Sequence, residues 1–133
     1  MMDRDDERVR ALLEAARAVR EKAYAPYSGF KVGAAVLTGA GTVHVGCNVE
    51  NASYGATICA ERAALFGMVA TGETGPVAVA IFVDDVEPAM PCGMCRQVIS
   101  EFGRDVLIVT ATPTSTKHST IEALLPDAFV LRK

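Results

Sequence analysis

Apolar side chains recur every three or four residues across residues 9–23, and charged residues fill most of the positions between them. This spacing predicts an amphipathic first helix with one face turned toward the protein interior. The Ala-Pro-Tyr-Ser-Gly run at residues 25–29 ends the helix. The apolar stripe consists of Val9, Leu12, Leu13, Ala16, Val19 and Ala23.

Five later segments are predicted to contain β-strands. Residues 30–37 are rich in small side chains, so another element should pack closely on them, and with residues 43–47 they predict a β-hairpin. Residues 77–83 form a nearly continuous apolar run, which is typical of a strand buried on both faces. Residues 106–110 predict a further strand, and the polar segment 111–117 a short last one.

Two helices, predicted at residues 58–70 and 92–102, alternate with the buried strands. Ser119 and Glu122 have the spacing of a capping box for a short helix that ends at Leu125. This order predicts an α/β protein, a three-layer α/β/α sandwich around a central mixed five-stranded sheet.

Length and charge limit the classes of function. The chain of 133 residues, half of them apolar, fits one domain over residues 1–133. Its net charge of −3 and its lack of a Lys/Arg cluster disfavour nucleic-acid binding, because neutralised phosphates supply most of that affinity. No apolar run reaches the roughly 18 residues that cross a bilayer, and the charged residues 1–7 do not resemble a signal peptide. We expect a cytoplasmic protein with a small-molecule substrate and no membrane partner.

Three cysteines and one glutamate are the candidate chemical groups. Cys59 lies two residues before Glu61, and a Cys-x-x-Cys pair, Cys92 and Cys95, follows later in the chain. Three thiolates suit zinc and leave a fourth tetrahedral position open, as catalytic sites do. Residues two apart face one object only where a helix begins, so we expect two helix N-termini to converge on the ion. Their dipoles would offset the negative charge of the thiolates.

Other interpretations of these residues stay open at this point. A Cys-x-x-Cys pair alone also fits a redox pair or a structural zinc site. A structural site needs a fourth ligand, and the only spare cysteine, Cys47, is expected to be a small core residue. His44 and His118 lie away from any ligand spacing and are expected to face solvent. Arg62 and Gln97 follow ligands closely and are candidates to hydrogen-bond cysteine sulfurs.

Cys-x-Glu followed by Pro-Cys-x-x-Cys is a signature of zinc-dependent nucleobase deaminases. Over nearly its whole length the chain resembles the small homotetrameric cytidine deaminases. A cysteine at position 59, where the larger dimeric branch carries histidine, favours the tetrameric branch. Five segments carry the resemblance, in order: residues 25–34 (APYSGFKVGA), 46–51 (GCNVEN), 59–62 (CAER), 91–97 (PCGMCRQ) and 124–129 (LLPDAF).

The resemblance implies a reaction and the residues that perform it. The reaction is the zinc-dependent hydrolytic deamination of cytidine and 2′-deoxycytidine to uridine and 2′-deoxyuridine, with release of ammonia, in pyrimidine salvage. By the same resemblance, Cys59, Cys92 and Cys95 hold one zinc ion per subunit. Glu61 takes a proton from water and returns protons to the ring and to the departing ammonia.

The resemblance also implies substrate contacts. Asn48 and Glu50 match residues that hold a ribose hydroxyl, Phe30 the residue that packs on the base, and Ala60 the backbone N–H that reads it. Residue type alone leaves two alternatives open: Asn48 and Glu50 could form a loop turn, and the aromatic residues could pack in the core. The residues that reach into a neighbouring subunit's pocket match Ala52, Tyr54 and Phe129, so we expect a homotetramer with shared active sites.

Three other functions compete with this one. Deamination of a cytosine nucleoside antibiotic of the blasticidin S kind uses a similar scaffold, although Glu50 favours the ribonucleoside. Editing of a polynucleotide is disfavoured by size and charge. A structural zinc module acting as a binding protein would have no open coordination position and would not depend on Glu61.

Overall fold

Five strands form one mixed sheet in the computed structural model, which describes residues 1–132. Their spatial order is β2-β1-β3-β4-β5. The pair β3 and β4 is parallel, and every other neighbouring pair is antiparallel. This arrangement confirms the predicted mixed sheet. The strands are β1 (Val32–Thr38), β2 (Val43–Cys47), β3 (Pro76–Val83), β4 (Leu107–Ala111) and β5 (Thr116–Thr120).

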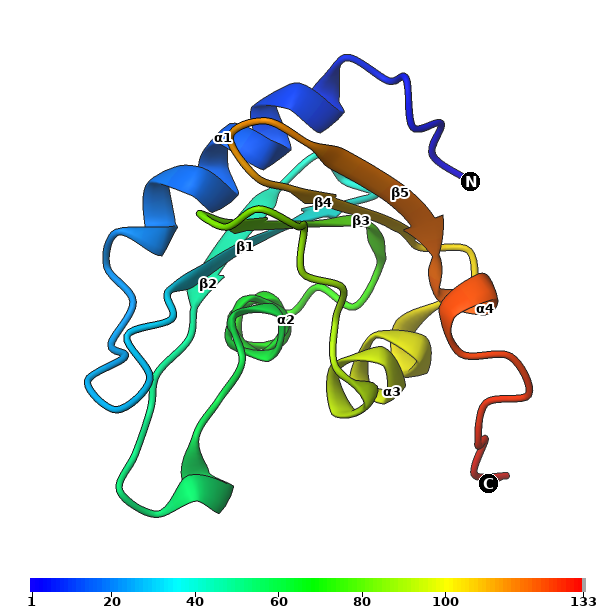
Figure 1. The fold of residues 1–133 in the computed structure, drawn as a ribbon. Helices are drawn as coiled ribbons and strands as arrows, with labels where there is room; N and C mark the ends of the chain where they lie inside the picture. Colours follow the sequence, from blue (N-terminus) through cyan, green and yellow to red (C-terminus); the bar gives the residue numbers. More distant parts are fainter. Residues whose placement is uncertain (133) are drawn as a thin grey trace.

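Helices cover both faces of the sheet and confirm the three predicted layers (Figure 1). One face is covered by α1 (Arg8–Arg20), and the opposite face by α2 (Ala60–Ala70) and α3 (Gly93–Phe102). The short helix α4 (Ile121–Leu124) follows β5, and a 3-10 turn, η1 (Tyr54–Ala56), precedes α2. Within residues 1–132, no helix has the length and apolar character needed to cross a membrane.

The sheet divides the core into two clusters, because successive side chains of a strand point to opposite faces. In β1, Ala35 and Leu37 pack on the side of α1, whereas Ala34 and Val36 pack on the side of α2 and α3. Nearly every residue of β3 is buried, which confirms the prediction of a strand covered on both faces.

Two glycines allow helices to approach the sheet more closely than any side chain would permit. A Cβ atom at Gly33 of β1 would lie 1.9 Å from the Ala16 carbonyl oxygen of α1. A Cβ atom at Gly46 of β2 would lie 2.4 Å from the Ala64 amide nitrogen of α2. The contact at Gly33 confirms the close packing predicted for residues 30–37. The contact at Gly46 was not predicted, and it places α2, the helix that follows Cys59.

Two predicted boundaries near the C-terminus are wrong. The last strand was predicted within residues 111–117 but covers Thr116–Thr120, because residues 112–115 form a turn in which the Thr112 amide donates to the Ser115 carbonyl at 2.8 Å. The N-cap of α4 is Thr120, whose Oγ1 accepts from the Ala123 amide at 3.2 Å. Thr120 is the last residue of β5, immediately before the helix, whereas Ser119 lies one residue earlier in the strand.

The structure also corrects the placement of both histidines and of Cys47. His44 is not solvent-facing: its side chain is 12% exposed, and its Nε2 lies 2.6 Å from a carboxylate oxygen of Glu73. His118 is half-buried within β5. Cys47 is half-buried and not part of the core, because it lies at the end of an edge strand.

Candidate metal centre and active site

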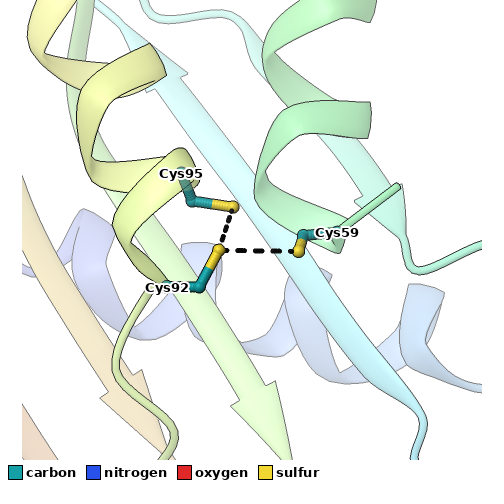
Figure 2. Close-up of side chains that lie close together, drawn as sticks. All are labelled: Cys59, Cys92 and Cys95. Atoms are coloured by element: carbon teal, nitrogen blue, oxygen red, sulfur yellow. Dashed lines mark hydrogen bonds between the residues drawn. The ribbon is translucent and has the colours of Figure 1, made fainter. Parts of the chain in front are cut away.

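Three thiols meet where two helices begin. Cys59 is the N-cap of α2, Cys92 is the N-cap of α3, and Cys95 lies in the first turn of α3. Figure 2 shows the three sulfur atoms gathered between the two helix ends. The predicted convergence of two helix N-termini is therefore confirmed, and Cys47 is not part of the group.

The spacing of these sulfurs fits a tetrahedral zinc ion. Sγ of Cys59 lies 3.8 Å from Sγ of Cys92, which lies 3.5 Å from Sγ of Cys95, and all three lie within 4.8 Å of one another. Ligands at the usual Zn–S distance of about 2.3 Å lie about 3.8 Å apart in a tetrahedron. These three residues could thus hold zinc without rearrangement of the backbone.

Arg62 and the neighbouring thiols set the charge of this group. A hydrogen bond from Cys95, with a further one from the Arg62 guanidinium, lowers the pKa of Cys59 to about 5. The Arg62 Nη2 atom lies 3.4 Å from the Cys59 sulfur, the kind of contact expected from the sequence. The bond to Cys59 and burial raise the pKa of Cys95. Without a metal, negative charge therefore collects on Cys59.

Glu61 is a buried carboxyl group in the first turn of α2. It is only 5% exposed, and burial, followed by the charge of Cys59, raises its pKa. With Cys59, Cys92 and Phe30 it lines a cavity of about 240 Å³ with largely apolar walls. A carboxyl group with a raised pKa beside a possible metal site is a candidate for proton transfer.

Asn48 and Phe30 form another part of the same cavity wall, next to Ala60. The Asn48 side chain bridges two backbone groups: Oδ1 accepts from the Val32 amide and Nδ2 donates to the Phe30 carbonyl, both at 2.8 Å. Asn48 thus fixes the backbone between Phe30 and Val32, where the chain enters β1. Phe30 is 43% exposed, so core packing does not explain it.

Glu50 lies outside this cavity but next to it. It lines a neighbouring cavity of about 370 Å³ with Tyr27, Ser28 and Tyr54. Thr57 contributes to the walls of both cavities. The two cavities therefore adjoin at Thr57, with the cysteine group on one and the Glu50 carboxylate on the other.

The three residues expected to reach a neighbouring subunit lie on the outside of the chain. Tyr54 is 80% exposed, Phe129 is 70% exposed, and Ala52 is also exposed. Gln97 does not make the expected bond to a cysteine. Its Nε2 donates to the Phe129 carbonyl at 3.2 Å, so it fixes the C-terminal segment to α3.

Sequence reasoning missed five apolar residues of the cavity, which are Val32, Ile58, Ile81, Ala89 and Met90. Ile81 lies in the second half of β3, and Met90 immediately precedes the Pro-Cys-x-x-Cys run. One available signal was the rule that ligand sites form at the carboxyl ends of parallel strands. The other was the position of Met90 beside a ligand.

Together, the α/β/α layers and a three-thiol group beside a buried carboxyl have the features of a zinc-dependent hydrolytic site. The family model that describes the cytidine and deoxycytidylate deaminase zinc-binding region matches residues 6–111. The chain belongs to this family.

Named relatives cover almost the entire chain. The cytidine deaminase of Sporosarcina psychrophila is 44% identical over 123 residues, which are 91% of this chain and 90% of that protein. The crystal structure of cytidine deaminase from Burkholderia pseudomallei has 50% identity and a TM-score of 0.87, over 90% of this chain and 98% of its own. The crystal structure of cytidine deaminase from Mycobacterium tuberculosis has 42% identity and a TM-score of 0.79, over 95% of this chain and 100% of its own.

Proposed function

We propose that this enzyme deaminates cytidine and 2′-deoxycytidine hydrolytically, with zinc, and releases uridine or 2′-deoxyuridine and ammonia. The observation that carries the proposal is the position of buried Glu61 beside the three-thiol group, on a cavity that also holds Phe30. The relatives named above, all cytidine deaminases, support the same substrate class.

In this proposal Cys59, Cys92 and Cys95 hold one zinc ion in each subunit. The bound ion supplies Lewis acidity, which makes water nucleophilic near neutral pH. Arg62 offsets part of the negative charge of three thiolates by its contact with Cys59. The N-termini of α2 and α3 act in the same direction.

Glu61 moves the protons of the reaction. Its carboxylate takes a proton from the attacking water and delivers it to N3 of the pyrimidine as the hydroxide adds to C4. The carboxylate then takes the proton of the new C4 hydroxyl and passes it to the amino group, so that the C4–N bond breaks, ammonia departs and a C4 carbonyl remains. Burial raises its pKa, which brings the group closer to the pH at which it must both accept and donate a proton.

Other residues orient the nucleoside. Phe30 packs on the base, and the backbone N–H of Ala60, in the same cavity wall, hydrogen-bonds to it. Asn48 and Glu50 hold a hydroxyl of the sugar; their positions on two cavities that share Thr57 support this role. A site built around that hydroxyl discriminates against substrates that lack it.

We further propose a homotetramer in which Ala52, Tyr54 and Phe129 complete a neighbouring subunit's site. Their exposure in a single chain supports this role. Truncation of Phe129 to alanine should then lower activity or assembly, and light scattering beside kinetics would detect either. If both stay unchanged, the shared-site proposal is wrong.

The metabolic setting we propose is pyrimidine salvage in the cytoplasm, with free nucleosides and not nucleic acid or membranes as partners. The net charge of −3 supports the exclusion of polyanions. The deciding experiment is a substrate panel of cytidine, 2′-deoxycytidine, cytosine and blasticidin S, with zinc analysis of the same sample. We expect turnover of the two nucleosides, followed as falling absorbance. Zinc-loaded protein that turns over neither would refute the proposal, and turnover of blasticidin S alone would favour the antibiotic-deaminating alternative.

A further inference from the structure

Ser28 lies at the centre of a hydrogen-bond network around Glu50. The Oε1 atom of Glu50 accepts from the backbone amides of Tyr27 at 2.9 Å and of Ser28 at 3.1 Å. The Oε2 atom accepts from the Ser28 hydroxyl. These bonds, that of the Ser28 hydroxyl above all, lower the pKa of Glu50. The loop before β1 is thus fastened to one carboxylate.

The same hydroxyl also holds Phe30, since the backbone amide of Phe30 donates to Ser28 Oγ at 3.0 Å. A serine hydroxyl has one hydrogen and two lone pairs, so it can donate to Glu50 and accept from Phe30 at once. Gly29 turns the backbone between them at a φ of 70°, a conformation that glycine adopts without strain.

The position of Phe30 depends on these bonds more than on packing. Neither of the core clusters formed by the described residues includes Phe30. Its carbonyl accepts from Asn48 Nδ2 at 2.8 Å, so side chains hold both polar groups of its backbone. Removal of one anchor would let the exposed ring drift within the cavity wall.

We propose that Ser28 is a positioning residue that couples the sugar-binding end of the site to the base-binding end. One hydroxyl sets both the Glu50 carboxylate and the Phe30 backbone, so the two ends cannot be adjusted independently. This inference rests on the proposed function, in which Glu50 contacts the sugar and Phe30 the base. Ser28 touches neither the thiols nor Glu61, which come from α2 and α3, so it should govern substrate binding and not the chemical step.

The test is steady-state kinetics with cytidine for Ser28→Ala, Ser28→Thr and the control Ser119→Ala. Ser119 is a strand serine, and within residues 1–132 its hydroxyl hydrogen-bonds to the Thr120 carbonyl alone, at 3.5 Å. We expect Ser28→Ala to raise KM about tenfold or more, the scale of a lost hydrogen bond to a charged group. Values of kcat, zinc content and the thermal midpoint should stay close to those of the unaltered enzyme. Ser28→Thr keeps the hydroxyl at an exposed position and should restore KM.

A double-mutant cycle with Phe30→Leu separates positioning from a general structural role. If Ser28 acts through Phe30, Ser28→Ala should change KM clearly less in the Phe30→Leu background, because coupled residues are non-additive. Unchanged KM in Ser28→Ala, fully additive effects, or a parallel fall of kcat and thermal midpoint that threonine does not restore would each overturn the inference. Failure of the unaltered, zinc-loaded enzyme to turn over cytidine would instead refute the proposed function.

Discussion

Substitution of Gly46 by alanine should damage catalysis more than it damages the fold. The added Cβ would lie 2.4 Å from the Ala64 amide nitrogen, 2.7 Å from the Ala60 carbonyl oxygen and 2.9 Å from the Ala63 carbonyl carbon. All three are backbone atoms of α2, so no side chain can rotate out of the way. Relief to an ordinary contact of 3.4 Å requires α2 to move by about 1 Å (3.4 minus 2.4).

That displacement falls on the first turns of α2, next to the two residues that matter most. Cys59 is the N-cap of this helix and Glu61 its second residue. A misplacement of about 1 Å at a reacting group can cost about 10²-fold in rate. Overpacking of this kind destabilises a protein by about 1–3 kcal/mol. A typical free energy of unfolding is about 5–15 kcal/mol, so the variant should still fold. We therefore expect a folded Gly46→Ala protein whose kcat is about a hundredfold lower.

Gly33→Ala is the matched control on the other face of the sheet. Its Cβ would lie 1.9 Å from the Ala16 carbonyl oxygen and 2.8 Å from the Arg20 amide, both in the backbone of α1. The shortest of these distances is shorter than the 2.4 Å at Gly46, so the clash is at least as severe. However, α1 carries no candidate site residue. Destabilisation should therefore match or exceed that of Gly46→Ala, with a much smaller loss of kcat.

The assay combines urea unfolding, zinc content and kcat for both variants at a temperature where each is folded. A hundredfold loss of kcat confined to Gly46→Ala would support the role of this contact in placing Cys59 and Glu61, the proposed metal ligand and proton carrier. Equal losses of kcat in the two variants, or a Gly46→Ala enzyme with normal kcat, would refute the reasoning.

Three further predictions concern single residues. Glu61→Gln should retain zinc yet lose at least about 10²–10⁴-fold in kcat, and near-normal turnover in a zinc-loaded sample would contradict its role. In metal-free protein, iodoacetamide at pH 6 should modify Cys59 before Cys47, because the pKa of Cys59 is lowered to about 5. Mass spectrometry of the labelled protein with and without zinc tests this order, and modification of Cys47 before Cys59 would contradict it. His44 holds the pKa of Glu73 below its usual 4.5, so Glu73 adds stability above that pH and loses it as the pH falls through the lowered value. In urea unfolding, Glu73→Gln should therefore have a lower free energy of unfolding than the unaltered protein at pH 7, and this difference should shrink as the pH falls. A difference that does not change with pH would exclude the linkage.

Local patterns were sufficient for most of the fold, because helices and buried strands have distinct periods. The stripe across residues 9–23 led to α1, and the apolar run at residues 77–83 led to β3. The ends near residues 111–120 were misplaced for a physical reason. The boundaries of β5 and the choice of Thr120 as a cap depend on pairing with β4, and a polar edge strand has no signal of its own for that pairing.

The cysteine group followed from spacing, but its surroundings did not. Cys59, Cys92 and Cys95 occupy short motifs whose geometry can be worked out locally. The bond between His44 and Glu73 joins residues 29 positions apart, and that between Gln97 and Phe129 joins residues 32 apart. Neither pairing has a periodic signature, since each depends on how separate elements dock.

The caps of α2 and α3 show how function departs from local stability. Ser, Thr, Asp and Asn are the residues that stabilise a helix N-terminus, by about 0.5–2 kcal/mol relative to alanine. Here both N-cap positions hold cysteine, Cys59 and Cys92, and neither side chain accepts a capping hydrogen bond from a backbone amide of its helix. Two caps that forgo this stabilisation and lie side by side are hard to explain by folding alone. A shared metal ligand role explains both at once, because the extended backbone of an N-cap directs a thiol beyond the helix end, where the free amides favour a thiolate.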